Sequence, residues 1–433
     1  MNSPPKKIGL LLGAGFSYDL GMPLAKELTE VLLAPFSERG VKNLVRAMCL
    51  GRPNGPDRPP NERALSECFD VLLSYKSSNG QNYEAMLSRL EELAGSHVGS
   101  QSDRDSARYV LAMLYELIHD ILSLYQAASY DILYPKNARW YSNLGNVLST
   151  EETWIFSLNH DLFLECLALD SKIPISYGDV QTREFPVSNL EMHERVRFTC
   201  IDRREYNADS PGFIRHGQGI NLVKLHGSLS EHEYDYDDKE TICNLDLNRT
   251  SSQELLAEYA KVSRMAYYEN GVKAAAAKDR FVTNLDGQCD VLGKAMLTGG
   301  RKYSTTANTK PGEEKLSLLD RVLGEIDQLT VIGYGFGDKH VNFRISNAMA
   351  RRDGLSLWIV DPNRSQVPEF LEHFDYNSRI RRASSGATLW MDYCKSNRWD
   401  VAQMESLKAN AMLRKAVRDQ VEISLQPGRR PSP

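Results

Sequence analysis

Two short polar motifs in this chain could carry out acid–base chemistry on a bound ligand. The tripeptide Asn-His-Asp occupies positions 159–161, and His226 is followed by Gly227. An imidazole titrates near neutral pH, which suits proton transfer, and amide and carboxylate groups can hydrogen-bond a ligand. Each motif also has a structural interpretation, because Asn159 and Asp161 could cap a helix and His226 could be a hydrogen-bonded histidine beside a turn.

Two glycine-rich segments could bring the backbone close to a phosphate group. The first, at 13–17, reads Gly-Ala-Gly-Phe-Ser, and the second, at 333–338, reads Gly-Tyr-Gly-Phe-Gly-Asp. Small residues allow a close approach, and a helix that follows such a turn offers its N-terminal N–H groups to an anion. The alternatives are a tight strand-to-helix turn for the first segment and a mobile loop for the second. The dinucleotide fingerprint is incomplete, since Tyr18 stands in place of its third glycine.

A single carboxylate, Asp361, follows a further apolar run at 357–360. At the end of a strand, a carboxylate can accept hydrogen bonds from the hydroxyl groups of a ribose. When Asp361 is considered alone, a cap for the turn at Pro362 and Asn363 is the simpler interpretation.

Five short apolar runs must position these residues. They occupy 8–12, 154–157, 222–225, 329–332 and 357–360, and each ends in one of the motifs above. Such runs are typical of parallel strands buried on both faces. The carboxyl ends of parallel strands share one edge of a sheet, and ligands bind there, near the switch in strand order. We therefore predict an α/β fold with a Rossmann-like parallel sheet, helices on both faces and large, mainly helical insertions.

The predicted sheet domain spans 1–396 and contains two insertions, at about 30–145 and about 230–320. The first insertion includes the clearest amphipathic helix, at 105–125. In the second, six acidic residues surround one lysine at 231–240, which favours a solvated loop over a metal site. A C-terminal helix and tail follow over 397–433, with the helix at about 400–423.

Composition and charge exclude several classes of protein. The 433 residues carry a net charge of -5, so we expect no direct nucleic-acid binding. No apolar run is long enough to span a membrane. The seven cysteines include no Cys-x-x-Cys pair, which argues against a disulfide framework and against a zinc site. We expect a reduced, cytoplasmic protein that binds no metal.

In combination, the motifs resemble those of the sirtuin superfamily. The segment 13–23, which ends at Pro23, resembles its opening NAD-binding motif. Asn-His-Asp at 159–161 resembles its Asn-x-Asp motif, and His226 with Gly227 resembles its catalytic His-Gly. The segment 333–342 resembles a signature of the prokaryotic sirtuin-like branch, which includes NAD-consuming effectors of anti-phage defence. The matching motifs occur in the family's order between Ile8 and about Asn363.

This resemblance implies NAD as the substrate and a role for each motif. Asn159 would orient the ribose and the attacking water, Asp161 would contact the nicotinamide amide, and His226 would act as general base. Asp361 would contact the adenosine ribose. The remaining NAD-binding residues implied by the resemblance are Gly13, Ala14, Gly15, Ser17, Pro23, Gly333, Gly335, Phe336 and Asp338.

Two departures from the deacylase pattern of the family favour simple NAD hydrolysis. Pro23 is followed by Leu-Ala-Lys where the deacylases have Asp-Phe-Arg, and the four-cysteine zinc module is missing. We therefore expect an NAD glycohydrolase, and the resemblance suggests a defence effector that depletes NAD on phage infection. The alternatives are a regulatory subunit that binds NAD or ADP-ribose without turnover, and a protein ADP-ribosyltransferase or deacylase.

An NADase that kills its own cell must stay inactive until it is triggered, and the sequence shows no obvious separate sensor domain for the trigger. We expect self-assembly into a homo-oligomer or activation by a separate protein, for which the resemblance suggests a partner ATPase or a short Argonaute. The helical insertion and the last helix are the predicted contact surfaces.

Overall fold

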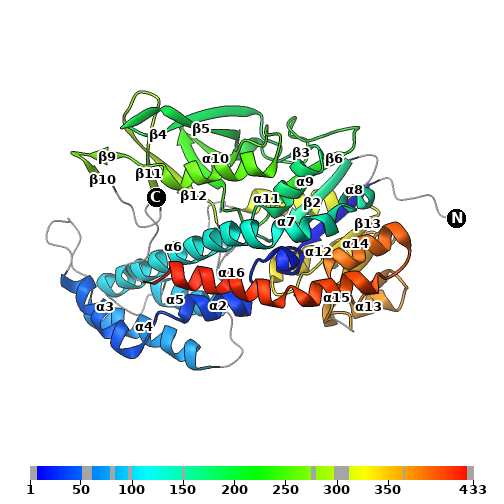
Figure 1. Cartoon of the computed structure of the whole chain (residues 1–433), viewed down its shortest axis with the longest axis horizontal. Coiled ribbons are helices and arrows are strands. Elements are labelled where there is room, and N and C mark those ends of the chain that lie inside the picture. The colour runs from blue at the N-terminus through cyan, green and yellow to red at the C-terminus, as the bar shows by residue number, and fades with distance from the viewer. Residues whose placement is uncertain are drawn as a thin grey trace.

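The computed structural model is built around a parallel sheet of seven strands (Figure 1). It describes residues 7–50, 61–78, 83–95, 100–148, 152–274, 279–296, 312–363 and 366–426. The strand order is β15-β14-β13-β1-β2-β6-β3, and all neighbours run parallel. The strands are β1 (Ile8–Leu12), β2 (Glu152–Ser157), β3 (Ile175–Ser176), β6 (Gly219–Lys224), β13 (Gln328–Ile332), β14 (Ser356–Val360) and β15 (Ile380–Ala383).

All five predicted strands are present, and their register brings their carboxyl ends to one edge. Leu12 at the end of β1 pairs with Ile332 on one side and with Ser157 on the other, and Ser157 in turn pairs with Lys224. The chain runs outward from β1 through β2 and β6, and later returns to the other side of β1 as β13. The switch in strand order therefore lies between β1 and β13, where a ligand crevice is expected.

Helices cover both faces of this sheet, because successive strand residues point into two separate cores. On one face, Leu11 and Val331 pack with residues of α11 (Glu313–Leu323) and α12 (Lys339–Arg351). On the other face, Leu10 and Ile155 belong to a core shared with α6 (Gln101–Ile132), α9 (Phe163–Asp170) and α14 (Ala387–Ser396). Burial on both faces explains why these strands read as continuous apolar runs. The predicted fold class is confirmed.

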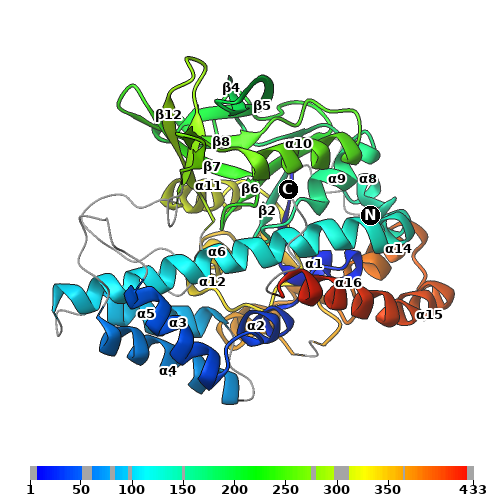
Figure 2. The same ribbon diagram turned by 60° about the vertical axis from the view of Figure 1, so that its left-hand side comes forward.

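The described residues between β1 and β2 are helical, and α6 crosses the molecule above the shorter helices (Figure 2). The helix predicted at 105–125 is present and longer, since it starts at a capping box formed by Ser100 and Asp103. Its neighbours are α1 (Ala14–Ser17), α2 (Ala25–Leu33), α3 (Glu38–Leu50), α4 (Glu62–Ser77), α5 (Tyr83–Gly95), α7 (Tyr134–Asn137) and α8 (Leu144–Val147).

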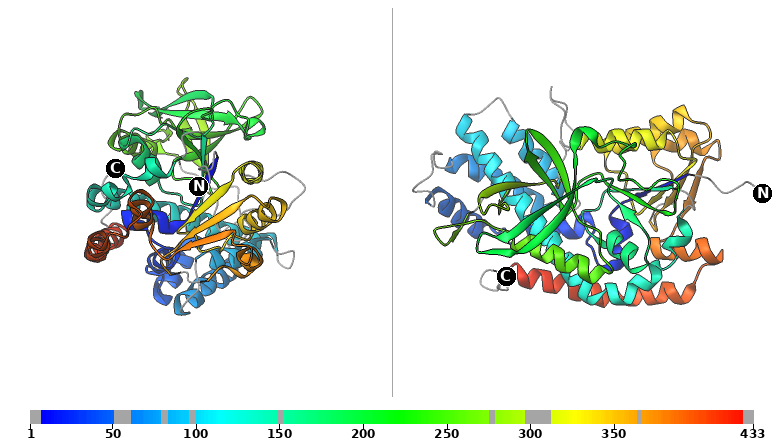
Figure 3. Two further views of the ribbon diagram at one scale, coloured as in Figure 1. Left: turned by 90° about the vertical axis from the view of Figure 1, so that its right-hand side faces the viewer. Right: turned by 90° about the horizontal axis from the view of Figure 1, so that it is seen from above.

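A second, antiparallel sheet forms a separate layer that the sequence patterns do not predict (Figure 3). It begins at Gln181, ahead of the predicted second insertion, and α10 (Ser252–Arg264) packs against it. Its six strands are, in spatial order, β11 (Arg280–Thr283), β12 (Cys289–Lys294), β7 (Glu231–Tyr236), β8 (Lys239–Leu245), β5 (Glu191–Asp202) and β4 (Gln181–Ser188). A separate two-stranded ribbon pairs β9 (Tyr268–Glu269) with β10 (Val272–Lys273).

The prediction that residues 231–240 form a solvated loop is wrong. The segment supplies β7 and the start of β8, joined by a turn at Asp237 and Asp238, both of which have positive φ. Glu231 at the start of β7 is buried, because Lys315 of α11 neutralises its carboxylate. The acidic composition of this segment is therefore compatible with a strand, because Lys315 compensates the charge of Glu231 at its buried end.

The C-terminal segment packs on the N-terminal helices. The single helix predicted at about 400–423 is interrupted at Asn410, which separates α15 (Val401–Ala409) from α16 (Ala411–Ser424). Val417 and Val421 of α16 are buried along α6, and Arg418 pairs with Glu30 of α2 at 2.8 Å. The inner face of α16 therefore packs against α6 and α2 of the same chain. The short helix α13 spans Glu372–Asp375.

No helix in the part of the chain that the structure describes is long and apolar enough to cross a membrane.

Candidate functional site

The two glycine-rich strand ends pack directly against each other. The N–H of Gly13 donates to the carbonyl of Ile332, and the N–H of Gly15 donates to the carbonyl of Gly333, both at 3.0 Å. Gly333 has a φ of +64°, and a Cβ there would lie 2.5 Å from the backbone of Gly15. A Cβ on Gly13 would lie 2.6 Å from Gly333 and Tyr334. Contact between the two loops therefore requires glycine at all three positions.

Ser17 joins Asn159 and Asp161 into one buried hydrogen-bonded cluster. Asn159 Nδ2 donates to Ser17 Oγ at 3.2 Å and to the carbonyl of Gly13 at 3.0 Å. Ser17 Oγ in turn donates to Asp161 Oδ1 at 3.0 Å. Asp161 Oδ1 also accepts from the N–H of Phe163, in the first turn of α9. The N-cap of α9 is Leu162, so Asp161 bonds the first turn from just ahead of the cap, and it also ties the ends of β1 and β2 together.

Some oxygen atoms of this cluster remain available to a ligand. Among the described residues, Oδ1 of Asn159 and Oδ2 of Asp161 accept no hydrogen bond. The two side chains nevertheless keep fixed orientations, because their other polar atoms are bonded to the protein. Such an arrangement suits the positioning of a polar ligand.

His226 is paired with a carboxylate from the second glycine-rich segment. Its Nε2 lies 2.8 Å from Asp338 Oδ2, and both side chains are largely buried. Asp338 Oδ1 accepts from the N–H groups of His340 and Val341, which makes Asp338 the N-cap of α12. Both oxygens of Asp338 are therefore engaged, and the carboxylate holds the imidazole at the end of β6 against the end of β13.

Tyr334 and Asn342 brace the loop that carries Asp338. The hydroxyl of Tyr334 lies 3.0 Å from the N–H of Asp338 and 3.0 Å from Oδ1 of Asn342. Asn342 Nδ2 donates to the carbonyl of Phe336, which has a φ of +56°. The sequence suggests a loop-ordering role for Asn342 but assigns none to Tyr334. Both residues order the loop, and both lie in the segment 333–342.

The loop after β1 is held by residues far away in the sequence. Tyr141 donates to the carbonyl of Phe16 at 2.5 Å, and Asn137 donates to the carbonyl of Asp19 at 2.5 Å. The Arg414 guanidinium from α16 hydrogen-bonds the carbonyl of Tyr18 and stacks 3.6 Å from the centre of its ring. These contacts, together with the buried Pro23 that follows, leave the loop little freedom.

Burial of this loop also affects the one carboxylate within it. Desolvation raises the pKa of Asp19 above its usual value, while the hydrogen bond from Thr388 and the charge of Arg414 act in the opposite direction. Asp19 therefore belongs to the internal framework of the loop.

The other residues predicted to bind NAD lie at the same sheet edge but outside these two clusters. Asp361 Oδ1 accepts from the N–H of Asn363, as expected for a turn cap, and its own N–H donates to the carbonyl of Ala383. Phe336 packs against Tyr334 and Phe370. Ala14 and Gly335 are exposed, and a Cβ on Gly335 would meet no atom within 4 Å.

Sequence analysis missed Lys224, a buried lysine beneath the site. It ends β6, two residues before His226, and its ammonium lies 3.0 Å from Glu165 of α9. Its side chain is 1% exposed and that of Glu165 is fully buried. The available signal was a charged residue inside the otherwise apolar run 222–225.

The structure offers no metal site among the described residues, since no three His, Cys, Asp or Glu side chains gather there. An open cavity of about 690 Å³ lies near the amino end of β6, between β3 and the loop 246–250. Its lining includes none of the predicted site residues. The clusters described above, rather than this cavity, therefore define the candidate site.

Comparison with known proteins finds alignments with solved structures but none with sequence families. No family model and no curated protein matches the sequence. A Sir2 homologue solved in complex with NAD aligns at 11% identity and a TM-score of 0.36, over 95% of this chain and 91% of that chain. A mutant Sir2 homologue in complex with ADP-ribose aligns at 10% identity and a TM-score of 0.34, over 98% of this chain and 96% of that chain.

Proposed function

We propose that this protein is an NAD glycohydrolase, which cleaves NAD to nicotinamide and ADP-ribose. The observation that carries this proposal is the meeting of two hydrogen-bonded groups at the carboxyl edge of the sheet. The first group is Ser17, Asn159 and Asp161, and the second is His226 with Asp338. The second group joins the end of β6 to the loop after β13, on the other side of the switch between β1 and β13, where dinucleotides bind in open parallel sheets.

The chemistry requires positioning more than strong acid catalysis. The bond between nicotinamide and ribose joins a cationic pyridinium to the anomeric carbon, and nicotinamide leaves as a neutral molecule. The transition state resembles an oxocarbenium ion, as in other glycosyl cleavages. Water adds its oxygen to the anomeric carbon and loses one proton, which a base must accept.

The described contacts support a role for each side chain. The open Oδ1 of Asn159 would orient a ribose hydroxyl or the attacking water, and the open Oδ2 of Asp161 would accept from the nicotinamide amide. His226 would take up the proton. Asp338, at 2.8 Å, would fix the imidazole ring and stabilise the imidazolium that forms.

The test is turnover by the purified protein. Incubation with NAD should release nicotinamide and ADP-ribose in equal amounts, measured by chromatography. Asn159→Ala and His226→Ala should each lower kcat by about 100-fold or more, since positioned proton transfer contributes that much. The control His193→Ala alters an exposed histidine on β5 and should leave kcat unchanged.

Three kinds of outcome would contradict parts of this proposal. Unchanged turnover in both Asn159→Ala and His226→Ala would overturn the site. Tight NAD binding by calorimetry without any product would instead identify a regulatory subunit that binds NAD or ADP-ribose. Transfer of label from NAD to a protein, or loss of an acyl group from lysine, would indicate the transferase or deacylase alternative.

We further propose that the activity serves phage defence by depleting NAD and is restrained until the protein assembles or meets an activating partner. An enzyme that removes NAD is toxic to its own cell unless it is controlled. Since α16 packs on α2 and α6, its outer face, where Met412 is 82% exposed, is the part of the last helix available for contact. Full NADase activity in a dilute monomer, verified by sedimentation, would refute the need for assembly.

A further inference from the structure

The ammonium group of Lys224 donates two hydrogen bonds and forms one ion pair. It donates to the carbonyl of Asp161 at 2.5 Å and to the carbonyl of Asn159 at 3.5 Å. Its third partner is Oε1 of Glu165, at 3.0 Å. A buried ammonium is costly unless its charge is compensated, and the carboxylate of Glu165 supplies the opposite charge while the two carbonyls accept hydrogen bonds.

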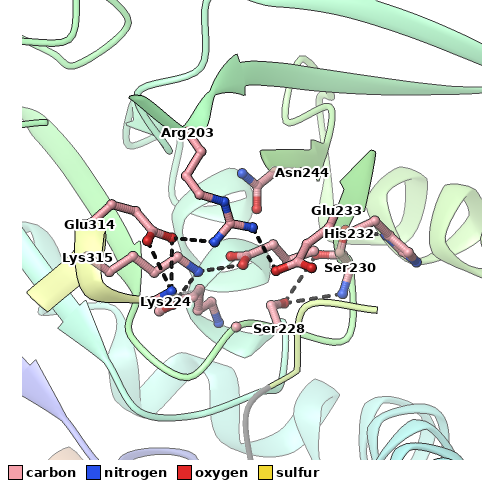
Figure 4. A network of polar contacts seen from close by, with 12 residues as sticks. Arg203, Lys224, Ser228, Ser230, His232, Glu233, Asn244, Glu314 and Lys315 are labelled. Carbon is pink, nitrogen blue, oxygen red and sulfur yellow. Dashed lines mark hydrogen bonds and ion pairs between the residues drawn. The ribbon is translucent and has the colours of Figure 1, made fainter. Parts of the chain in front are cut away.

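The main-chain carbonyl of Lys224 supports the turn that carries His226. Its carbonyl accepts from the N–H of Gly227 at 3.0 Å, which closes the turn that carries His226. It also accepts from Nζ of Lys315 at 2.8 Å, as Figure 4 shows. Lys224 therefore contacts the Asn159 loop with its side chain and the His226 loop with its backbone.

Further hydrogen bonds join these two loops to each other. The N–H of Leu229 donates to the carbonyl of His160 at 2.9 Å, and Nδ1 of His160 lies 3.3 Å from the carbonyl of Gly227. The carbonyls on either side of His160 are the two that Lys224 holds. The lysine thus anchors the outer carbonyls of the 159–161 motif to β6.

We propose that Lys224 is a positioning residue for NAD cleavage, because its buried ammonium sets the place of Asn159 relative to His226. This inference rests on the proposed function. It explains why a buried strand of a parallel sheet keeps a charge at a position where an apolar side chain would pack at lower cost. Displacement by about 1 Å of a group that orients a substrate can lower a rate by about 100-fold.

Lys224→Met alone would be ambiguous, since it leaves the carboxylate of Glu165 buried without a counter-charge and would destabilise the fold. The informative variant is the double substitution Lys224→Met with Glu165→Gln, which removes both charges and retains their volume. The glutamine can still accept the hydrogen bond that Tyr177 gives to Glu165.

The chain offers a matched control in a second buried pair, Lys315 and Glu231, whose side chains are 4% and 5% exposed. The substitutions Lys315→Met and Glu231→Gln remove the same charges nearby. Lys315 touches neither carbonyl of the 159–161 motif; its contacts are Glu231 and the main chain of Lys224. Both double variants should lose comparable stability in thermal unfolding.

The decisive measurement is kcat and KM for NAD in the two double variants. The Lys224 variant should lose about 100-fold in kcat with KM changed by less than about 3-fold, because the glycine loops that would hold the dinucleotide are untouched. The Lys315 variant loses one of two contacts to the Lys224 carbonyl and none to the 159–161 motif, so its kcat should fall by less than about 10-fold. Equal losses in both variants, or no loss in either, would overturn the positioning role.

Amide hydrogen exchange separates this inference from the proposed function. Backbone amides at 158–162 should exchange faster in the Lys224 variant than in the Lys315 variant. If the wild-type protein releases no nicotinamide, the proposed function fails and the positioning role for this reaction fails with it. If the wild type cleaves NAD but exchange at 158–162 is equal in the two variants, only the role of Lys224 is refuted.

Discussion

The parallel sheet and the antiparallel layer hold their functional parts in place by different means. At the edge of the parallel sheet, the two glycine-rich loops touch through their backbones, as at Gly15 and Gly333. In the antiparallel layer, charged side chains make the connections. Arg203 bridges Glu233 at 2.7 Å and Glu314 at 3.3 Å, as Figure 4 shows.

This difference teaches where each region tolerates change. Close backbone contact leaves no room for an added methyl group, so the sheet edge is sensitive to size. An ion network depends on charge balance, so the antiparallel layer is sensitive to the loss of one partner. Substitutions chosen by these two criteria should therefore affect the two regions separately.

The largest effect on stability is expected from Gly333→Ala. The residue has a positive φ, and its new Cβ would meet the backbone of Gly15 at 2.5 Å, so the loops must separate. We expect a loss of about 2 kcal/mol or more in the free energy of unfolding. Chemical denaturation measures it. The control Gly337→Ala adds its Cβ in open space, and an equal loss there would refute the steric account.

A smaller loss is expected from Arg203→Met in the antiparallel layer. It leaves the carboxylates of Glu233 and Glu314 without their shared cation, which should cost about 1–3 kcal/mol in the free energy of unfolding. Since Arg203 contacts neither cluster of the candidate site, kcat should change by less than about 2-fold. The exposed neighbour Arg204 serves as control through Arg204→Met. A large fall in kcat would show that the layers are coupled.

A further prediction concerns the pH dependence of stability and Asp179, which hydrogen-bonds Thr199 and Asn244 of the antiparallel layer. Burial raises its pKa to about 7. Because the folded protein retains this proton up to a higher pH than the unfolded chain, stability falls as pH rises from about 4 to about 7. Asp179→Asn should remove this fall.

Thermal unfolding at several pH values tests this expectation. The melting temperature of Asp179→Asn should exceed that of the wild type at pH 8 and approach it at pH 4.5. The control Asp209→Asn changes an exposed carboxylate and should follow the wild type throughout. A wild-type difference between pH 4.5 and pH 8 that persists in Asp179→Asn would assign the effect to other groups.

The parallel sheet was predictable because burial on both faces produces uninterrupted apolar runs such as 8–12 and 329–332. The antiparallel layer was not, since its strands mix buried and exposed positions with charges such as those of 231–240. Glu231 reads as a solvated residue until Lys315, 84 positions later, is known to face it. A pairing of this kind depends on tertiary structure and leaves no local pattern.

The candidate site was partly predictable for the same reason. Strand ends placed Asn159, Asp161 and His226 at one edge, and the structure brings them there. The pairing of Asp338 with His226 is long-range, and local reasoning placed Asp338 only with the dinucleotide. Gly13, Gly15 and Gly333 were predicted to let the backbone approach a phosphate, which stays a prediction. The described contacts show in addition that an added Cβ at these positions would clash with the facing loop.

The contact between Arg414 and Tyr18 has a consequence for how the chain is made. The two residues lie 396 positions apart. At about 5–20 residues per second, the ribosome needs roughly 20–80 s between adding one and adding the other. During that interval the first loop of the site lacks its last restraint. The loop after β1 is therefore synthesised among the first segments of the chain, but its contact with Arg414 forms among the last.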